Sequence, residues 1–391
     1  MKVVYILAVS WGGIPHYTAE LANAVSKYAD VVVLKPKDHN DSLFSKDIEV
    51  MQVFKPLQFS RGNIKRAYSL GNLRNMFSYV NVKIINKINT DVIHFPELYP
   101  YLNPFVCLYR LSNKCPIIYT SHAPLPLKTL KTYIRLWTLP ETLVYSVSVV
   151  TKMLVKVNKI IVHTQEAKNI LIRSGVNPEK IEVIPHGVYT LFKKYKQNNE
   201  KEAEENCILL FGQIGRNKGV DILLKAVPIV LNEINDAKFI IAGEGNILEH
   251  LKNENSIRKY RCIEIYNRFI PNDFVSYLFC RAKVVVLPYK GVGRGINQSG
   301  VLTIALSFGK PVIATYVATT PEIIRGCGIV IPPNNPKALA EAIITILKDE
   351  RLRKKMSRNA LKMAEKLSWD NIAKMHIKVY EEVLNERRSR S

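Results

Sequence analysis

The 391-residue sequence lacks the cysteine pattern of a metal centre or a disulfide framework. Its six cysteines are scattered along the chain and form no CxxC pair. This usage argues against a zinc site and favours a reducing, cytoplasmic compartment. The sequence also lacks a run of about eighteen uncharged apolar residues, so a membrane-spanning helix is not expected. Met1 and Lys2 lead directly into a strand-like VVYILAV segment without a cleavage site, which argues against a signal peptide.

Acidic residues are scarce as well, with 33 Asp and Glu against 56 Lys and Arg and a formal net charge of +23 at pH 7. The excess is concentrated between Lys55 and Lys159, where fifteen basic residues face three acidic ones. Such a surface attracts membrane phospholipid, a lipid diphosphate or nucleic acid. A soluble protein of generally basic composition is the alternative. Nucleic acid is disfavoured, because no motif that reads DNA or RNA accompanies the charge.

What the chain does contain is a regular succession of apolar, strand-like runs, most of them separated by segments of helical spacing or length. The runs are Val3–Val9, Val31–Leu34, Val92–Phe95, Ile117–Thr120, Ile160–His163 and Glu182–Pro185, then Ile208–Phe211, Phe239–Ala242, Ile263–Tyr266, Val284–Leu287, Val312–Thr315 and Ile329–Ile331. Apolar strands that alternate with helices are typical of parallel sheets covered on both faces. The sequence therefore predicts an α/β protein with two doubly wound, Rossmann-like domains. We expect them to face a central cleft at the carboxyl ends of the strands.

The polar segment Lys193–Asn206 separates the two sets of runs and has the composition of a linker. We therefore predict an N-terminal domain over residues 1–190, a linker over 191–206 and a C-terminal domain over 207–370. A C-terminal helix with a basic tail is expected over 371–391.

Two turns that follow strands are candidate anion sites. After the run Val284–Leu287, a glycine-rich loop leads to a helix expected over Gln298–Phe308, so that backbone N–H groups and a helix dipole would converge on a phosphate or diphosphate. After the first run, Gly12 and Gly13 precede a helix expected to begin near Thr18, and could approach a ligand closely. Glycines that only turn the chain are the alternative in both places.

Cationic side chains also follow a strand. Arg216 and Lys218 lie in the loop after Ile208–Phe211, where two cations would suit a diphosphate leaving group whose charge grows as its bond breaks. The same strand-to-loop pattern recurs at Gly243 and Glu244.

Histidines at strand ends are candidates for contact with a substrate. His94 and His122 could donate a hydrogen bond to a substrate hydroxyl or a developing charge. A histidine satisfied by neighbouring backbone is the alternative. Because His163 and His186 also follow apolar runs, position alone does not choose among the four.

The segment Tyr133–Val157 carries aromatic and aliphatic residues with Lys or Arg at its ends, and Pro140-Glu141 interrupts it. It is too broken to span a bilayer, but it could lie in the interface plane of a membrane. A helix hairpin packed on the domain is the alternative.

In order and spacing, motifs over nearly the whole chain resemble the retaining glycosyltransferases of group 1 (family 4-like), which have the two-domain GT-B fold. The N-terminal motifs are GGIPHYTAELANAV, DVIHF, PIIYTSHAP and KIIVHTQEAKNILIRSGVNPEKIEVIPHGVYTLF. The C-terminal motifs are FGQIGRNKGVDILLKA, FIIAGEG, VVVLPY, QSGVLTIALSFGKPVIAT, TPEII, GIVIPP and SWDNIAKMHIKVYEEVL. The resemblance implies a retaining hexosyltransferase of glycan biosynthesis. Its second domain would hold a UDP- or GDP-linked sugar, and its first a glycan or lipid-linked acceptor.

The same resemblance implies residue roles. His122 would lie near the anomeric carbon, and Lys218, with Arg216 nearby, would neutralise the diphosphate. His16 and His94 are assigned to the acceptor side. The residues assigned to the donor and its phosphates are Gly12, Gly13, Gly243, Glu244, Gln298, Ser299, Gly300, Val301 and Glu322.

The sequence departs from the group in two places. The usual pair of glutamates, separated by seven residues, would fall near Ile296 and Ile304, and a QSG motif stands there instead, as in a recognised sub-branch. The contacts of those carboxylates with the ribose and the donor sugar are therefore not carried over. The group's arginine near the loop lysine is displaced, because Gln213 and Gly215 fill its expected positions and Arg216 is one residue away.

No Asp-x-Asp metal motif occurs in the sequence, so we expect transfer without a metal or other cofactor, with Lys218, Arg216 and helix N-termini meeting the charge of the leaving group. No carboxylate stands out as a covalent nucleophile, and the family resemblance favours front-face attack. The preferred prediction is a cytoplasmic enzyme, peripheral on the membrane. A non-catalytic sugar-nucleotide-binding protein and a nucleotide-sugar epimerase of the same fold are the alternatives. The base, the sugar, the acceptor and the oligomeric state are not specified by the sequence.

Overall fold

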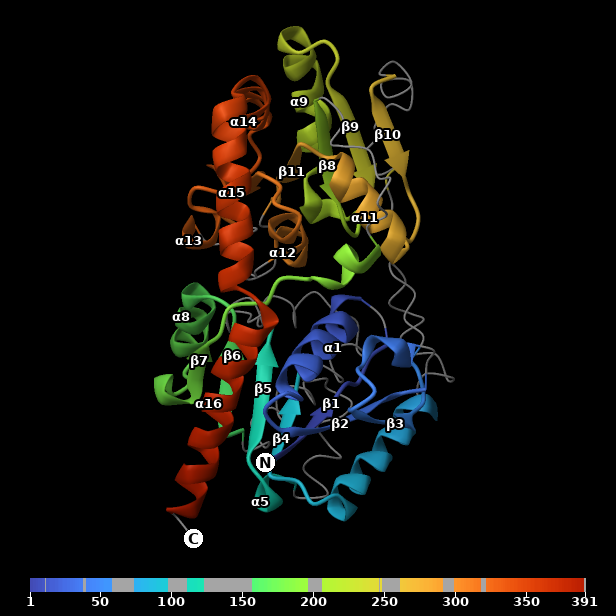
Figure 1. Ribbon diagram of the computed structural model, residues 1–391, viewed down its shortest axis with the longest axis vertical. Coiled ribbons are helices and arrows are strands. Elements are labelled where there is room, and N and C mark those ends of the chain that lie inside the picture. Colours follow the sequence, from blue (N-terminus) through green and yellow to red (C-terminus); the bar gives the residue numbers. More distant parts are fainter. Residues whose placement is uncertain are drawn as a thin grey trace, which may run out of the picture. The chain divides into compact units, whose positions relative to one another are not determined.

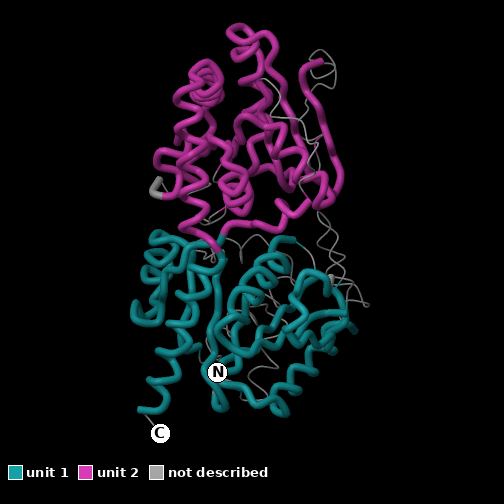
Figure 2. The backbone as a smooth tube through the Cα atoms, in the orientation of Figure 1, with its two compact units in different colours: residues 1–187, 369–391 teal, residues 188–368 magenta. Residues whose placement is uncertain are grey.

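The computed structural model of the protein (Figure 1) describes residues 1–10, 12–37, 40–57, 74–97, 111–122, 157–195, 206–245, 247, 261–290, 299–317 and 321–389. The chain divides into two compact units (Figure 2), which we describe separately. Unit 1 comprises Met1–Gly187 and Trp369–Ser391, and unit 2 comprises Val188–Ser368. The segment predicted from Tyr133 to Val157 as an interfacial element lies, apart from its last residue, outside the described residues.

Unit 1 is built on a seven-stranded parallel sheet in the order β3-β2-β1-β4-β5-β6-β7. Its strands are β1 (Lys2–Ile6), β2 (Asp30–Pro36), β3 (Glu49–Phe54), β4 (Val92–Phe95), β5 (Ile117–Ser121), β6 (Lys159–Val162) and β7 (Ile181–Val183). All except β3 coincide with predicted apolar runs. Edge strand β3 was missed because its sequence, EVMQVF, mixes exposed and partly buried positions and contains no continuous apolar run.

The helices of unit 1 are α1 (Gly13–Val25), α5 (Leu111–Lys114), α8 (Gln165–Arg173) and α16 (Trp369–Arg388), with 3-10 turns η1 (Asn40–Leu43), η2 (Phe77–Lys87) and η3 (Pro178–Lys180). Helix α1 begins at Gly13 and not near Thr18 as predicted. Pro15 is tolerated there because it lies in the first turn, where the helix needs no N–H donor. His16 is therefore a helical residue.

Helix α16 returns the end of the chain to unit 1. Its apolar side chains, among them Ile372, Val379 and Tyr380, join a core cluster with residues of β1 and α1. Trp369, at its first position, packs directly on Gly187, where an added Cβ would lie 2.6 Å from the indole ring. Only glycine permits this approach of the backbone to the ring.

Unit 2 has a six-stranded parallel sheet in the order β10-β9-β8-β11-β12-β13, and all six strands were predicted. They are β8 (Cys207–Phe211), β9 (Lys238–Ala242), β10 (Ile263–Tyr266), β11 (Val284–Leu287), β12 (Val312–Thr315) and β13 (Gly328–Ile331). The helices are α9 (Val220–Glu233), α11 (Asn272–Arg281), α12 (Gly300–Ser307), α13 (Pro321–Ile324), α14 (Pro336–Lys348) and α15 (Glu350–Lys366), with 3-10 turns η4 (Leu191–Tyr195) and η5 (Arg216–Lys218).

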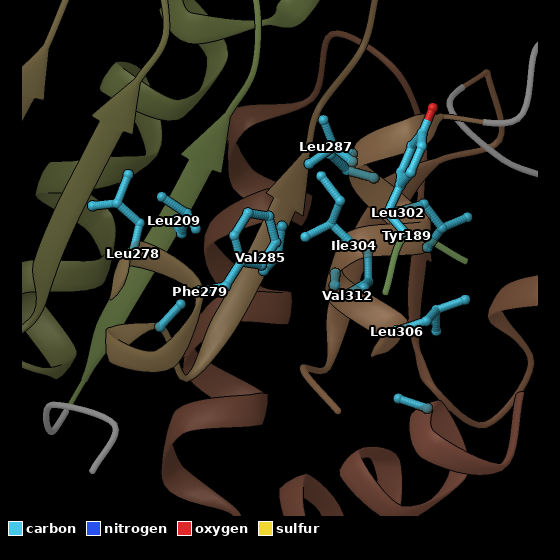
Figure 3. Packing of buried hydrophobic residues seen from close by; sticks show 14 of the residues in the cluster. Tyr189, Leu209, Leu278, Phe279, Val285, Leu287, Leu302, Ile304, Leu306 and Val312 are labelled. Atoms are coloured by element: carbon cyan, nitrogen blue, oxygen red, sulfur yellow. The ribbon is translucent and has the colours of Figure 1, made fainter. Parts of the chain in front are cut away.

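The core of unit 2 is continuous across the central strands. Val285 of β11 pairs with Leu209 of β8 on one side and with Val312 of β12 on the other. Figure 3 shows these side chains with Leu302 of α12 in one packed layer. Phe192, in the first part of the predicted linker, is buried in the same cluster. This layer holds the strands whose ends carry the candidate site.

The contact between Gly187 and Trp369 generates a stability prediction. Gly187→Ala should displace the indole ring and destabilise unit 1 by about 1–3 kcal/mol, the usual cost of overpacking. Hydrogen-exchange protection of α16 should fall accordingly. Gly215→Ala is the matched control, since an added Cβ there meets no atom within 4 Å. Equal protection of α16 in both variants would show that the contact between Gly187 and Trp369 does not stabilise this helix.

Candidate functional site

Three loops of unit 2 meet at one edge of its sheet, because the strands that precede them, β9, β8 and β11, are parallel neighbours. The loops touch through their backbones. A Cβ at Gly243 would lie 2.0 Å from the Gly212 carbonyl oxygen, and one at Gly219 would lie 1.9 Å from that of Pro288. Glycine at these positions therefore lets the three loops pack closely.

Lys218 is the cation that these loops place against an aromatic ring. Its Nζ donates a hydrogen bond to Tyr289 Oη at 2.6 Å and lies 3.9 Å from the ring centroid. Tyr289 Oη lies 3.0 Å from Ser299 Oγ, and Thr315 Oγ1 donates to the Tyr289 carbonyl at 2.9 Å. The structure thus links the predicted residues Lys218 and Ser299 through Tyr289, which sequence reasoning missed. Its position directly after the strand in the VVVLPY motif was the available signal.

The N-terminus of α12 adjoins this cluster. Ser299 is the N-cap residue, but its hydroxyl bonds to Tyr289 and makes no capping bond to the helix backbone. The N–H groups of the first turn, which begins with Gly300 and Val301, have no intrahelical acceptor. Together with the helix dipole they suit an anion. Gln298 lies outside the described residues.

The other residues predicted in unit 2 are placed less directly. Arg216 begins the 3-10 turn that Lys218 ends, and its side chain is exposed. The side chain of Glu244 is exposed, and its carbonyl accepts a hydrogen bond from the Ile214 N–H at 3.0 Å. Glu322 lies in α13, with its side chain outside the described part of the structure.

Unit 1 gathers four histidines at the carboxyl ends of four neighbouring strands. His94 lies in β4, and His122, His163 and His186 follow β5, β6 and β7. The ring of Tyr17, from α1, meets the last three with centroid distances of 4.5, 5.6 and 5.1 Å. His163 Nε2 lies 3.0 Å from His122 Nδ1. The order of the strands thus brings together histidines among which sequence position alone did not choose.

Burial keeps this cluster uncharged. His163 and His186 are buried, and their Nδ1 atoms lie 2.9 and 2.6 Å from backbone carbonyl oxygens. Loss of hydration lowers the pKa of His163 to about 4 and that of His186 to about 3. The pKa of His122, which is partly exposed, is held well below its usual value by desolvation and then by the neighbouring histidines. All three rings are therefore neutral at pH 7.

His94 has a different setting from the other three. It is fully buried, with Nδ1 2.6 Å from Tyr380 Oη and Nε2 2.8 Å from Thr120 Oγ1. Tyr380 Oη in turn lies 2.9 Å from Tyr5 Oη, so this chain of hydrogen bonds ties α16 to the sheet. Both ring nitrogens are engaged within the protein, which favours a structural role for His94 in place of the predicted acceptor contact.

Gly12, Gly13 and His16 lie where α1 begins. Gly12 is exposed and has φ 81°, and an added Cβ would meet no atom within 4 Å, so the left-handed backbone alone favours glycine there. Gly13 is the exposed first residue of the helix. His16 is half-buried, and desolvation lowers its pKa. Its imidazole is therefore biased towards the neutral form.

Two further observations concern only the residues that the structure describes. Among them, no group of three or more His, Cys, Asp or Glu side chains is placed to hold a metal ion. None of the described helices combines the length and the apolar character needed to cross a bilayer.

Solved structures share this architecture. Sucrose-phosphate synthase from Thermosynechococcus elongatus matches with a TM-score of 0.72 at 18% identity, over 99% of this chain and 100% of that one. HepE from Anabaena, in complex with UDP-glucose, matches with a TM-score of 0.70 at 17% identity, over 98% and 100% of the two chains. The two Rossmann-like units together define the GT-B fold.

Sequence comparison then gives the family. Residues 205–349 match the model of glycosyl transferases group 1, and residues 11–190 match that of glycosyltransferase family 4. An uncharacterized glycosyltransferase of Methanocaldococcus jannaschii is 31% identical over 223 residues, which are 56% of this chain and 55% of that protein. The chain belongs to the group 1, family 4 glycosyltransferases. It spans about half the length of the curated relatives that it matches.

The neutral histidines generate a pH prediction. Their unfolded-state pKa is about 6.5, so between about pH 6.5 and pH 4 the unfolded chain binds protons that folded unit 1 excludes. The free energy of unfolding should therefore fall as pH is lowered through this range, by up to about 3 kcal/mol per histidine. Denaturant titrations between pH 7 and about 4.5 measure this slope. His186→Gln should reduce it, and an unchanged slope would show that folding does not lower the pKa of His186.

Proposed function

We propose that the protein transfers a sugar from a nucleoside-diphosphate sugar, UDP- or GDP-linked, to a hydroxyl of a glycan or lipid-linked acceptor, with retention at the anomeric carbon. The observation that carries the proposal is the cluster of Lys218, Tyr289 and Ser299 beside the first amides of α12. A cation and a helix N-terminus at one point suit a diphosphate. The fold shared with HepE, whose structure contains UDP-glucose, supports the donor class.

The leaving group sets the electrostatic demand in this reaction. As the bond between the anomeric carbon and the phosphate oxygen breaks, negative charge grows on the diphosphate. In our proposal Lys218 and the N–H groups of Gly300 and Val301 stabilise that charge, with Arg216 as a second cation. Gly243 and Glu244, in the neighbouring loop, also bind the donor in this proposal. Because these groups supply positive charge themselves, we propose that transfer requires no metal ion.

The proposed chemical step retains the configuration at the anomeric carbon. The acceptor oxygen forms its bond to the anomeric carbon on the side from which the phosphate oxygen leaves. The acceptor's proton passes to that departing phosphate oxygen, and the nucleoside diphosphate is released. Unit 1 presents the acceptor in this scheme, with His122 near the reacting carbon and His16 on the acceptor side.

The charge of the chain supports a membrane setting for the acceptor. The formal net charge is +23, and an anionic leaflet attracts a surface of this sign. We therefore propose a cytoplasmic protein that binds peripherally to the membrane and uses a lipid-linked acceptor. A soluble glycan acceptor is the second candidate.

Transfer from a panel of labelled UDP- and GDP-sugars, in the presence of EDTA, tests the proposal. Label should enter the lipid phase of a membrane extract and be lost with Lys218→Ala. Label found only in soluble sugars would remove the membrane role. Transfer that appears only when divalent metal is restored would contradict metal independence. No transfer from any donor, with nucleotide still bound, would favour a sugar-nucleotide-binding protein.

Nucleotide binding gives a second, separate measurement. Lys218→Met should weaken binding of the correct nucleoside diphosphate roughly tenfold to a hundredfold, because a hydrogen bond to a charged group contributes roughly 1.5–3 kcal/mol. Lys225→Met, on the exposed surface of α9, is the matched control and should bind as the parent does. Calorimetric titration with UDP and GDP measures both. Equal weakening by the two substitutions would indicate general charge attraction without a defined site.

A further inference from the structure

The imidazole of His163 stands between a backbone carbonyl and the imidazole of His122. Its Nδ1 lies 2.9 Å from the Ile184 carbonyl oxygen, and its Nε2 lies 3.0 Å from His122 Nδ1. A carbonyl oxygen only accepts hydrogen bonds, so His163 Nδ1 carries a proton and donates a hydrogen bond to the Ile184 carbonyl oxygen. The state of His163 Nε2 then determines what His122 must do.

His163 Nε2 carries no proton as long as the ring is neutral. The ring is buried, and the titratable side chains that the described part of the structure places near it are those of Tyr17, His122, His186 and His376. None of these supplies a negative charge at pH 7 that would stabilise an imidazolium. His163 therefore presents a lone pair to His122 and accepts a hydrogen bond from it.

We infer that His163 is a positioning residue that fixes His122 in the tautomer with its proton on Nδ1 and a bare Nε2. His122 Nε2 is enclosed, and no described residue gives it a hydrogen bond. A neutral ring whose proton is used on Nδ1 offers only an acceptor at Nε2. Its complement is a hydrogen-bond donor, such as a sugar hydroxyl, and not a phosphate or carboxylate oxygen.

The competing tautomer would place the proton of His122 on Nε2. The Pro96 carbonyl, whose proximity acts to raise the pKa of His122, would be its acceptor. That arrangement would leave two nitrogen lone pairs facing each other 3.0 Å apart, at His122 Nδ1 and His163 Nε2. Because the Nδ1 tautomer converts this repulsion into a hydrogen bond, the structure favours it.

The catalytic consequence rests on the proposed function. If His122 lies beside the reacting sugar, a fixed lone pair at Nε2 orients one hydroxyl without sharing the charge of the leaving group. Loss of His163 would free His122 to exchange tautomers and to rotate. The effect should fall on turnover more than on donor binding, because the donor's diphosphate is held by unit 2.

Nitrogen NMR of protein labelled with 15N-histidine tests the tautomer directly. The His122 signals, identified by their loss in His122→Gln, should show a protonated Nδ1 and a bare Nε2 in the parent. His163→Leu should abolish this pattern and give exchange between tautomers. His163→Gln, whose amide oxygen can accept the same hydrogen bond, should restore it. His186→Leu is the matched control, since His186 is equally buried but donates to the Gly187 carbonyl, and should leave the pattern unchanged.

Kinetics on the same variants supply the second readout. His163→Leu should lower kcat roughly tenfold, the effect of one lost hydrogen bond, with little change in donor KM, and His163→Gln should recover most of it. A proton on Nε2 of His122 in the parent would overturn the inference, as would equal effects of His163→Leu and His186→Leu. If the parent shows the expected tautomer but transfers no sugar, the proposed function fails and the role of His163 in fixing His122 stands.

Discussion

Parallel strands end at the same edge of a sheet, and both candidate sites depend on this alignment. In unit 2 it places Lys218 against Tyr289, although the two are 71 residues apart in the chain. In unit 1 it places His122 against His163, 41 residues apart. Apolar layers pack on both faces of the unit 2 sheet, and Figure 3 shows one of them. This packing fixes the positions of the loops that follow the strands.

The two units use opposite electrostatics at these edges. In unit 2 the cation Lys218 lies partly exposed beside helix amides, an arrangement that attracts an anion. In unit 1 the histidines are desolvated, which holds their pKa values below the usual range and makes them neutral donors and acceptors. The reaction that we propose poses these two demands: a charged diphosphate to stabilise, and hydroxyl groups to orient.

Close backbone approaches make both arrangements possible. The loops of unit 2 pack without side chains at Gly219 and Gly243, and Gly187 in unit 1 leaves room for the indole of Trp369. Trp369 begins α16, whose Tyr380 completes the hydrogen bonds of His94. Helix α16 thus helps to hold the histidine cluster in place. Its amphipathic sequence does not predict this role.

The sequence by itself determined the α/β class and all the strands except β3, because buried parallel strands require continuous apolar runs. It also placed Lys218 in the loop after β8. It also gave the family, through motifs whose order is specific. It did not determine β3, which is an edge strand without an apolar run, or the start of α1. Only the tertiary structure decided that Tyr289 joins Lys218 to Ser299, that His94 is engaged by Tyr380, and that His163 contacts His122. These pairings follow from the order and register of the strands, which set the distances between residues that are remote in sequence. The sequence does not reveal them, because a buried aromatic residue or histidine has the same local pattern whether it fills a core or orients a site.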